Sequence, residues 1–294
     1  MGDILKKIID HLNNDNLSEA FDLCENNKDN KIEHLILNLK GVIFFKQQKF
    51  EQAKTEFLKS IDLDKSFIDP YKNLFKLNLK AQDYKSAINN GKKVIELEIQ
   101  KNPISYFNLA LAYDLNMDYK KALDLYKIVE ASNFKQKKIL YNNLAKCFLG
   151  AQNIDEAKNY YLKALEFDQN NKLIVNNLLI LFLRIGDKNK AEYFYKKAQE
   201  IDENYIEFKL NESDYLISKG NIEDAIKCLK TIIDNSKNYV AYTKLSKIYS
   251  MIGDLKNSIE VIEEAIIAYP NQKDLKFTRG MQHLIQGEFE KGWE

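Results

Sequence analysis

The sequence predicts an all-α protein built as a solenoid of consecutive helix-turn-helix repeats. Two observations indicate this fold class. A small residue recurs after a short polar turn at intervals of 33 to 35 residues along the 294-residue chain, which is the mark of an internal repeat. Around it, apolar residues recur at offsets of three, four and seven, so each segment carries one apolar helical stripe. A helical pair of this size cannot bury its own apolar face, so stacking on neighbours must supply the core.

The recurring small residue sets the order of the repeats. It stands at Ala20, Ala53, Ala87, Ala122, Ala157, Ala191, Ala225 and Ser258, and then at Gly292. The preceding turns share one pattern of Gly, Asp, Asn or Gln before a helix start, as in QDYKSA, GDKNKA and GEFEKG. We therefore expect one solenoid domain over residues 1–294, with eight full repeats and a partial ninth. Their predicted starts lie near residues 1, 34, 68, 103, 138, 172, 206, 239 and 273.

A second column lies in the first helix of each repeat, twelve residues before the recurring small residue. It contains Gly41, Phe75, Ala110, Ala145, Leu179, Ser213, Ser246 and Gly280, and most of these are small. Small side chains are expected where two helices cross closely. The first repeat matches least well, with Asn27 where a small apolar residue is usual, and this is typical of a terminal capping repeat.

Composition excludes several broad classes. The formal net charge is +1, which gives no general reason to expect nucleic acid or an anionic membrane as a partner. The start, MGDILKKIID, lacks the apolar core of a secretory signal, and the most apolar stretch, LIVNNLLILFLRIG, is too short to span a bilayer. Cys24, Cys147 and Cys228 form no C-x-x-C pair, which favours reduced thiols and a cytoplasmic protein.

No catalytic motif is present in the sequence. It contains no P-loop, G-x-G-x-x-G, H-E-x-x-H or G-x-S-x-G pattern. His11, His34 and His283 are distant from one another and from the cysteines, so the sequence supports neither a zinc site nor a Cys-His pair. We expect no catalytic residue, no metal and no cofactor in this chain, and we predict that it is not an enzyme.

Four residues after the recurring alanine, aromatic residues stand at Phe57, Tyr126, Tyr161 and Tyr195. The period, the small residues and these aromatic positions resemble the tetratricopeptide repeat family, whose units are about 34 residues long. This resemblance implies a right-handed α-solenoid in which the first helix of each unit lines a concave groove. It also implies a scaffold that binds an extended peptide or a partner protein in that groove.

One column of asparagines lies in the middle of the first helices. It consists of Asn73, Asn108, Asn143, Asn177 and Asn211. Asparagine is an unfavourable residue inside a helix, by up to about 0.7 kcal/mol relative to alanine, so five in register suggest another use. A carboxamide can bond both the C=O and the N–H of an extended backbone. The column resembles the asparagine ladder in the repeat arm of O-GlcNAc transferases, which implies peptide capture in the groove. The alternative is a structural or solvated column in a chain rich in asparagine.

Five lysines are expected to face the groove or its edge and to favour acidic segments or a C-terminal carboxylate. They are Lys72, Lys76, Lys146, Lys244 and Lys247. A two-carboxylate clamp, as in chaperone-binding members of the family, is an alternative. Its Lys and Asn pair is absent from the first repeat, where Leu5 and Ile9 occupy those places. Lysines on helical surfaces are also often only solvated.

The C-terminal stretch GEFEKGWE suggests a second function class. It resembles the last repeat of bacterial tetratricopeptide arms that lead into glycosyltransferase-like domains, although an ordinary repeat with Gly292 in place of alanine explains it equally well. The chain is therefore either a non-catalytic binding module or the substrate-recruiting arm of a larger enzyme whose catalytic domain follows residue 294. Self-association through terminal repeats is a third alternative.

Overall fold

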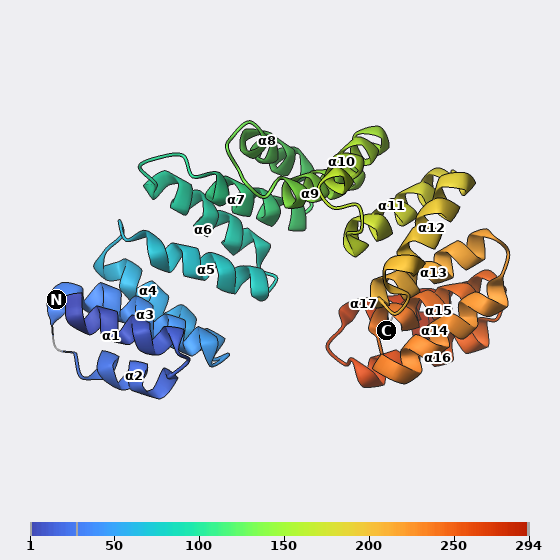
Figure 1. Cartoon of the computed structure of the whole chain (residues 1–294). Coiled ribbons are helices and arrows are strands. Elements are labelled where there is room, and N and C mark those ends of the chain that lie inside the picture. The colour runs from blue at the N-terminus through green and yellow to red at the C-terminus, as the bar shows by residue number, and fades with distance from the viewer. Residues whose placement is uncertain (1, 28, 293–294) are drawn as a thin grey trace. The chain divides into compact units, whose positions relative to one another are not determined.

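The structure is a computed structural model that describes residues 2–27 and 29–292. In these residues the chain forms consecutive pairs of α-helices with no strand between them (Figure 1). The predicted fold class, an all-α repeat solenoid, is confirmed. The chain divides into two compact units, Met1–Tyr160 and Tyr161–Glu294, and each is described by itself below. That all repeats form one continuous solenoid domain stays a prediction.

In its described residues, the first unit contains five helical pairs. Its first helices are α1 (Gly2–Asn13), α3 (Glu33–Lys46), α5 (Ile68–Lys80), α7 (Pro103–Leu115) and α9 (Lys137–Gly150). Its second helices are α2 (Leu17–Glu25), α4 (Phe50–Leu63), α6 (Tyr84–Leu97), α8 (Tyr119–Glu130) and α10 (Ile154–Glu166), the last of which runs past the unit boundary. A 3-10 turn, η1 (Asn30–Ile32), precedes α3. Each first helix begins within one residue of a predicted repeat start.

The second unit continues the same alternation. Its helices are α11 (Lys172–Ile185), α12 (Lys188–Asp202), α13 (Ile206–Ser218), α14 (Ile222–Ser236), α15 (Tyr239–Met251), α16 (Leu255–Ala268), α17 (Lys273–Ile285) and α18 (Phe289–Gly292). Of the predicted C-terminal motif, Trp293 and Glu294 lie outside the described residues.

One backbone geometry recurs in the turn inside every pair. The residue five positions before the recurring small residue has a left-handed conformation, with φ between 58° and 82°. These residues are Asp15, Gln48, Gln82, Met117, Gln152, Gly186, Gly220, Gly253 and Gly287. The left-handed residue ends the first helix and turns the chain into the second. It is never glycine in the first unit and always glycine in the second.

In several repeats the aspartate after this turn caps the second helix, as at Asp83, Asp118, Asp187 and Asp254. The residues at the matching positions of other repeats, Asn16, Lys49 and Asn221, form no such side-chain cap. In the third repeat, the Asp83 N–H donates to the Asn78 carbonyl at 2.9 Å, closing the end of α5. The Asp83 side chain then accepts from the Ser86 N–H at 3.1 Å at the start of α6. Such a cap satisfies donors that the helix itself leaves unpaired. In the repeats with such an aspartate, the polar pattern of the sequence therefore provides both the turn and the cap.

The recurring small residues are buried at the helix crossings. All eight, from Ala20 to Ser258, are at most 2% exposed. The preceding column is equally close-packed at Gly41, where an added Cβ would lie 2.5 Å from the ring of buried Phe57. A small residue is therefore needed at the recurring position and at Gly41, because the two helices of a pair approach closely there.

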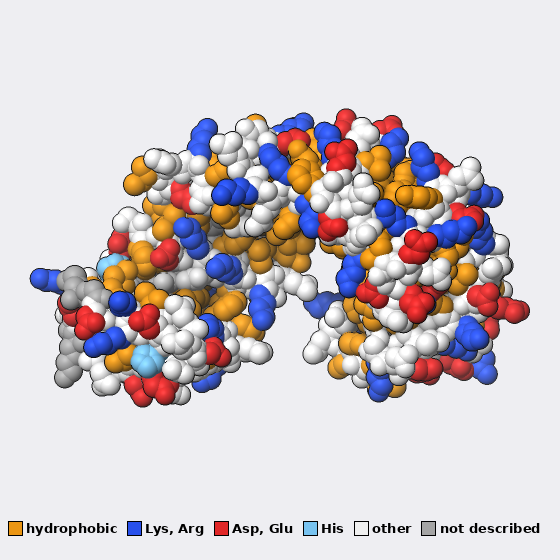
Figure 2. All heavy atoms as spheres, viewed as in Figure 1, with side chains coloured by type: hydrophobic (Ala, Val, Ile, Leu, Met, Phe, Trp, Pro, Cys, Tyr) orange, Lys and Arg blue, Asp and Glu red, His pale blue; other side chains and the backbone are white. Residues whose placement is uncertain are grey.

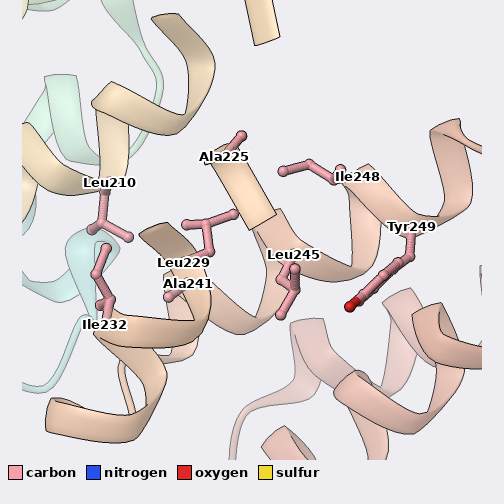
Figure 3. Close-up of a cluster of buried hydrophobic side chains, with 8 residues drawn as sticks. All are labelled: Leu210, Ala225, Leu229, Ile232, Ala241, Leu245, Ile248 and Tyr249. Atoms are coloured by element: carbon pink, nitrogen blue, oxygen red, sulfur yellow. The ribbon is translucent and has the colours of Figure 1, made fainter. Parts of the chain in front are cut away.

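Apolar side chains from three successive helices form each section of the core. Figure 3 shows one section in the second unit, where Leu210 of α13, Leu229 and Ile232 of α14, and Leu245 of α15 belong to one cluster. Leu229 is fully buried.

No helix within residues 2–27 and 29–292 combines the length and apolar composition that a membrane-spanning helix requires.

Candidate functional site

The asparagine column lies on five successive first helices. Asn73, Asn108 and Asn143 stand on α5, α7 and α9 of the first unit, and Asn177 and Asn211 stand on α11 and α13 of the second. All five side chains are half-buried. None is at a helix start, so capping does not explain the column.

Two of the amides bond to other asparagines. The Asn73 Nδ2 donates to Asn38 Oδ1 at 2.9 Å, and the Asn142 Nδ2 donates to Asn143 Oδ1 at 3.4 Å. Asn38 and Asn142 stand one position earlier in the helix and are buried. Part of the column is thus used to join neighbouring side chains rather than left open for a ligand.

The remaining members differ from one another. Asn177 interacts with another group of the chain. The side chains of Asn108 and Asn211 form no hydrogen bond in the described part of the chain. Because both side chains are half-buried and therefore partly accessible, their amides are the members of the column best able to form hydrogen bonds with the backbone of a ligand.

The column continues at Lys244, 33 residues after Asn211. The Lys244 Nζ forms an ion pair with Asp214 Oδ2 at 2.6 Å, which joins α15 to α13. Of the other predicted lysines, Lys72 is half-buried, and Lys76, Lys146 and Lys247 are exposed. Lys146 lies close enough to Asp114 of α7 that its charge opposes the rise in the carboxyl pKa caused by burial.

A hollow of about 520 Å³ lies on the first helices of the second unit. Three helices, α11, α13 and α15, contribute its lining, and Lys244 and Lys247 are the predicted site residues that it includes. Its other lining residues are Ile180, Leu183, Arg184, Asp214, Ile217, Ser218, Ile248 and Met251. A volume of this size is in the usual range for binding sites. The structure therefore places two predicted site residues, Lys244 and Lys247, beside apolar side chains that were not predicted to belong to a site.

The comparisons with known proteins bear on the repeats. The family model for the tetratricopeptide repeat matches residues 35–67, 140–171 and 239–272. These three segments are tetratricopeptide repeats. Within 104 residues, the chain is 34% identical to Heat shock protein STI1 of Saccharomyces cerevisiae, a match that covers 35% of this chain and 17% of the yeast protein. The chain therefore matches only about a sixth of the length of that relative.

Solved structures show the same fold at low identity. A tetratricopeptide repeat protein from Parabacteroides merdae superposes with a TM-score of 0.60 at 19% identity, covering 76% of this chain and 89% of that one. The Cut9–Hcn1 structure gives a TM-score of 0.59 at 12% identity, covering 90% of this chain and 52% of that one. PilF of Pseudomonas aeruginosa gives 0.55 at 15% identity, covering 72% and 95%. At these identities the likeness shows the fold alone.

The cysteines of the chain are free thiols with little nucleophilic character. Cys24 and Cys147 are buried and Cys228 is half-buried. Burial raises the pKa of Cys24 and of Cys147 to about 12, and that of Cys228 to about 11. Because the thiolate is the reactive form, very little of each cysteine is reactive at neutral pH.

Besides the predicted Lys244 and Lys247, the hollow contains residues that were not predicted from the sequence, although the repeat spacing carried a signal for them. Ile180, Asp214 and Lys247 occupy one column, and Arg184 and Met251 belong to another. Both columns follow from the same 33- and 34-residue steps that revealed the asparagines. The asparagine column consists of identical residues and is easily seen in the sequence, whereas the columns that line this surface have mixed chemistry.

Proposed function

We propose that this chain is a non-catalytic scaffold that binds an extended segment of a partner protein along its first helices. The asparagine column would supply hydrogen bonds to the backbone of that segment. The observation that carries the proposal is the column itself: five half-buried amides in register on successive first helices, in a place where asparagine weakens a helix.

The amides of Asn108 and Asn211 carry most of this proposal. Each offers an oxygen acceptor and an NH2 donor, and an extended backbone offers a complementary N–H and C=O. Bonds of this kind hold a chain without reading its side chains. Asn73 and Asn143 are already engaged with neighbouring asparagines, so we expect them to position the surface more than to grip the ligand.

The comparisons support a scaffold in general terms. A fold like this one occurs in the Cut9–Hcn1 hetero-tetramer, where it is part of a protein assembly. The high pKa values of the three thiols agree with a chain that does not use cysteine nucleophiles.

The test is peptide binding by the full chain and by the double variant Asn108→Ala/Asn211→Ala, measured on an array of random and acidic peptides. We expect the variant to fold at least as stably, since alanine is the better helix former by up to about 0.7 kcal/mol per site. We expect its binding to be weaker by about ten-fold, which corresponds to roughly 1.4 kcal/mol for two lost amide contacts.

The matched control is Asn89→Ala/Asn189→Ala, which makes the same change at exposed positions on second helices, one in each unit. It should leave binding unchanged. Equal binding by wild type and the Asn108→Ala/Asn211→Ala variant, or unfolding of that variant, would remove the role proposed for the column. Absence of binding to every peptide would refute the scaffold proposal as a whole.

A further inference from the structure

The hollow of the second unit is built by the repeat and not by one helix alone. Its lining comes from matching positions on α11, α13 and α15. Leu183 and Ile217 occupy one column and Arg184, Ser218 and Met251 occupy another. The surface therefore runs across the helices, in the direction that a bound chain would follow from one repeat to the next.

Apolar side chains form the floor of the hollow. Leu183 and Ile217 are half-buried, and Met251 at the edge is 56% exposed. On the next first helix, α17, Met281 and Ile285 occupy the repeat positions that match Lys247 and Met251, 34 residues later, and they are 43% and 56% exposed. A row of accessible apolar side chains on neighbouring helices would be stabilised by burying an apolar side chain of a ligand.

The charged groups of the hollow are unbalanced. Asp214 is paired with Lys244 at 2.6 Å, so its charge is neutralised within the wall. Arg184 and Lys247 are exposed and form no ion pair in the described part of the chain. Two cations thus remain beside an apolar floor, while charges of both signs are interspersed over the face of the molecule in Figure 2. This is a local excess of positive charge, and it favours an anionic group on the ligand.

We propose that this hollow binds an extended protein segment in which an aliphatic or aromatic side chain stands next to acidic residues. The apolar side chain lies on Leu183, Ile217 and Met251, and the carboxylates accept hydrogen bonds from Arg184 and Lys247. This inference rests on the proposed scaffold function and adds the chemical class of the partner segment. It assigns selectivity to the hollow, whereas the asparagine column contributes contacts that do not depend on sequence.

The experiment measures fluorescence anisotropy of three dye-labelled peptides with the full chain. Each peptide has about twelve residues, enough for an extended chain to cross three neighbouring helices. The probe is GSGSLEELSGSG, and its matched peptides are GSGSLKKLSGSG, with reversed charge, and GSGSSEESSGSG, without the apolar side chains. We expect the first peptide to bind at least about ten-fold more tightly than either of the others, and its affinity to fall as salt is raised.

Two variants locate the binding. Lys247→Glu should weaken binding of GSGSLEELSGSG by about ten-fold or more through reversal of one contact, and Met251→Ser should weaken it by removing the apolar edge. Both side chains are exposed, so neither change should disturb folding, which circular dichroism would verify. The control is Lys256→Glu on α16, where the lysine side chain is 85% exposed and lies outside the hollow; it should bind like the wild type.

The outcomes separate this inference from the scaffold proposal. Equal affinity for the three peptides, tighter binding of the lysine peptide, or equal losses in Lys247→Glu and Lys256→Glu would overturn the inference. If array peptides still bound in a manner that depends on Asn108 and Asn211, the scaffold proposal would stand without it. No binding of GSGSLEELSGSG at high concentration would also overturn the inference.

Discussion

At the scale of single residues, the first unit contains a carboxylate in an unfavourable position. Asp114 of α7 is half-buried, and burial raises the pKa of its carboxyl above the usual 3.8, although the charge of Lys146 opposes the rise. Nearby, burial and the Asp114 charge raise the pKa of Cys147. A charged Asp114 therefore makes the folded state less stable at neutral pH than a neutral side chain of the same size would.

We expect Asp114→Asn to increase the free energy of unfolding at pH 7. Because the pKa of Asp114 is higher in the folded than in the unfolded chain, the folded chain binds the proton more tightly. The wild type therefore loses stability as the pH rises from 3.8 through the raised pKa. The advantage of the variant should be complete above that pKa and should disappear below 3.8. Urea unfolding at several pH values measures it.

The exposed Asp124 of α8 provides the control for this prediction. Asp124→Asn should change the free energy of unfolding by no more than about 0.5 kcal/mol at any pH, as is usual for surface positions. If Asp114→Asn were destabilising at pH 7, the contacts of the charged carboxylate would outweigh the cost of its burial. The attraction of Lys146 would then be the dominant effect.

At the scale of the helical pair, the left-handed turn residue links sequence to stability. Gln82 has φ of 58° and Gly220 has φ of 82°, at the same position of two different repeats. A side chain at this conformation costs about 1 kcal/mol relative to glycine. The first unit carries this cost at each of its turns because it has Asp, Gln or Met there.

Gln82→Gly should therefore stabilise the chain, and Gly220→Gln should destabilise it, each by about 1 kcal/mol. At Gly220 an added Cβ would meet no atom within 4 Å, so backbone strain alone sets the size of that loss. Thermal and urea unfolding of both variants measure the pair of effects. If both variants changed the free energy of unfolding in the same direction, contacts of the glutamine side chain, rather than φ, would determine the change.

At the scale of the whole molecule, the main packing in the described residues joins helices of one repeat and of adjacent repeats, so damage should remain local. Leu229 of α14 is fully buried in the cluster that joins α13, α14 and α15 (Figure 3). Leu229→Ala should remove about 2–5 kcal/mol of local stability by leaving a cavity. Stacked repeats share no single central core, so the loss should affect the mutated repeat and, through their interfaces, the repeats next to it.

Amide hydrogen exchange tests this locality. We expect Leu229→Ala to reduce protection in α13, α14 and α15 while leaving α3 to α5 of the first unit as in the wild type. The exposed Lys227→Ala on the same helix is the control and should leave all of these helices unchanged. An equal loss of protection in both units would indicate that the chain opens as one cooperative block.

A repeat sequence contains information on helix positions and helix faces, and these were the features of the protein that could be predicted. Periodic residues predict on which face of a helix a side chain lies, and the burial of Ala53, Ala122 and Ala225 follows from their spacing alone. The positions of the first helices and the fold class were predictable for the same reason. The placement of the asparagines in the middle of first helices was predictable as well.

The contacts of those side chains were decided only by the tertiary structure. Asn73 meets Asn38 and Lys244 meets Asp214 because neighbouring first helices lie side by side with one particular offset. The hollow of the second unit depends on the same offset, since its lining comes from three helices. A repeat sequence by itself therefore determined the helices and their buried faces. The stacking of those helices determined which polar groups pair with each other and which remain available to a ligand, because pairing depends on distances between repeats that no single period encodes.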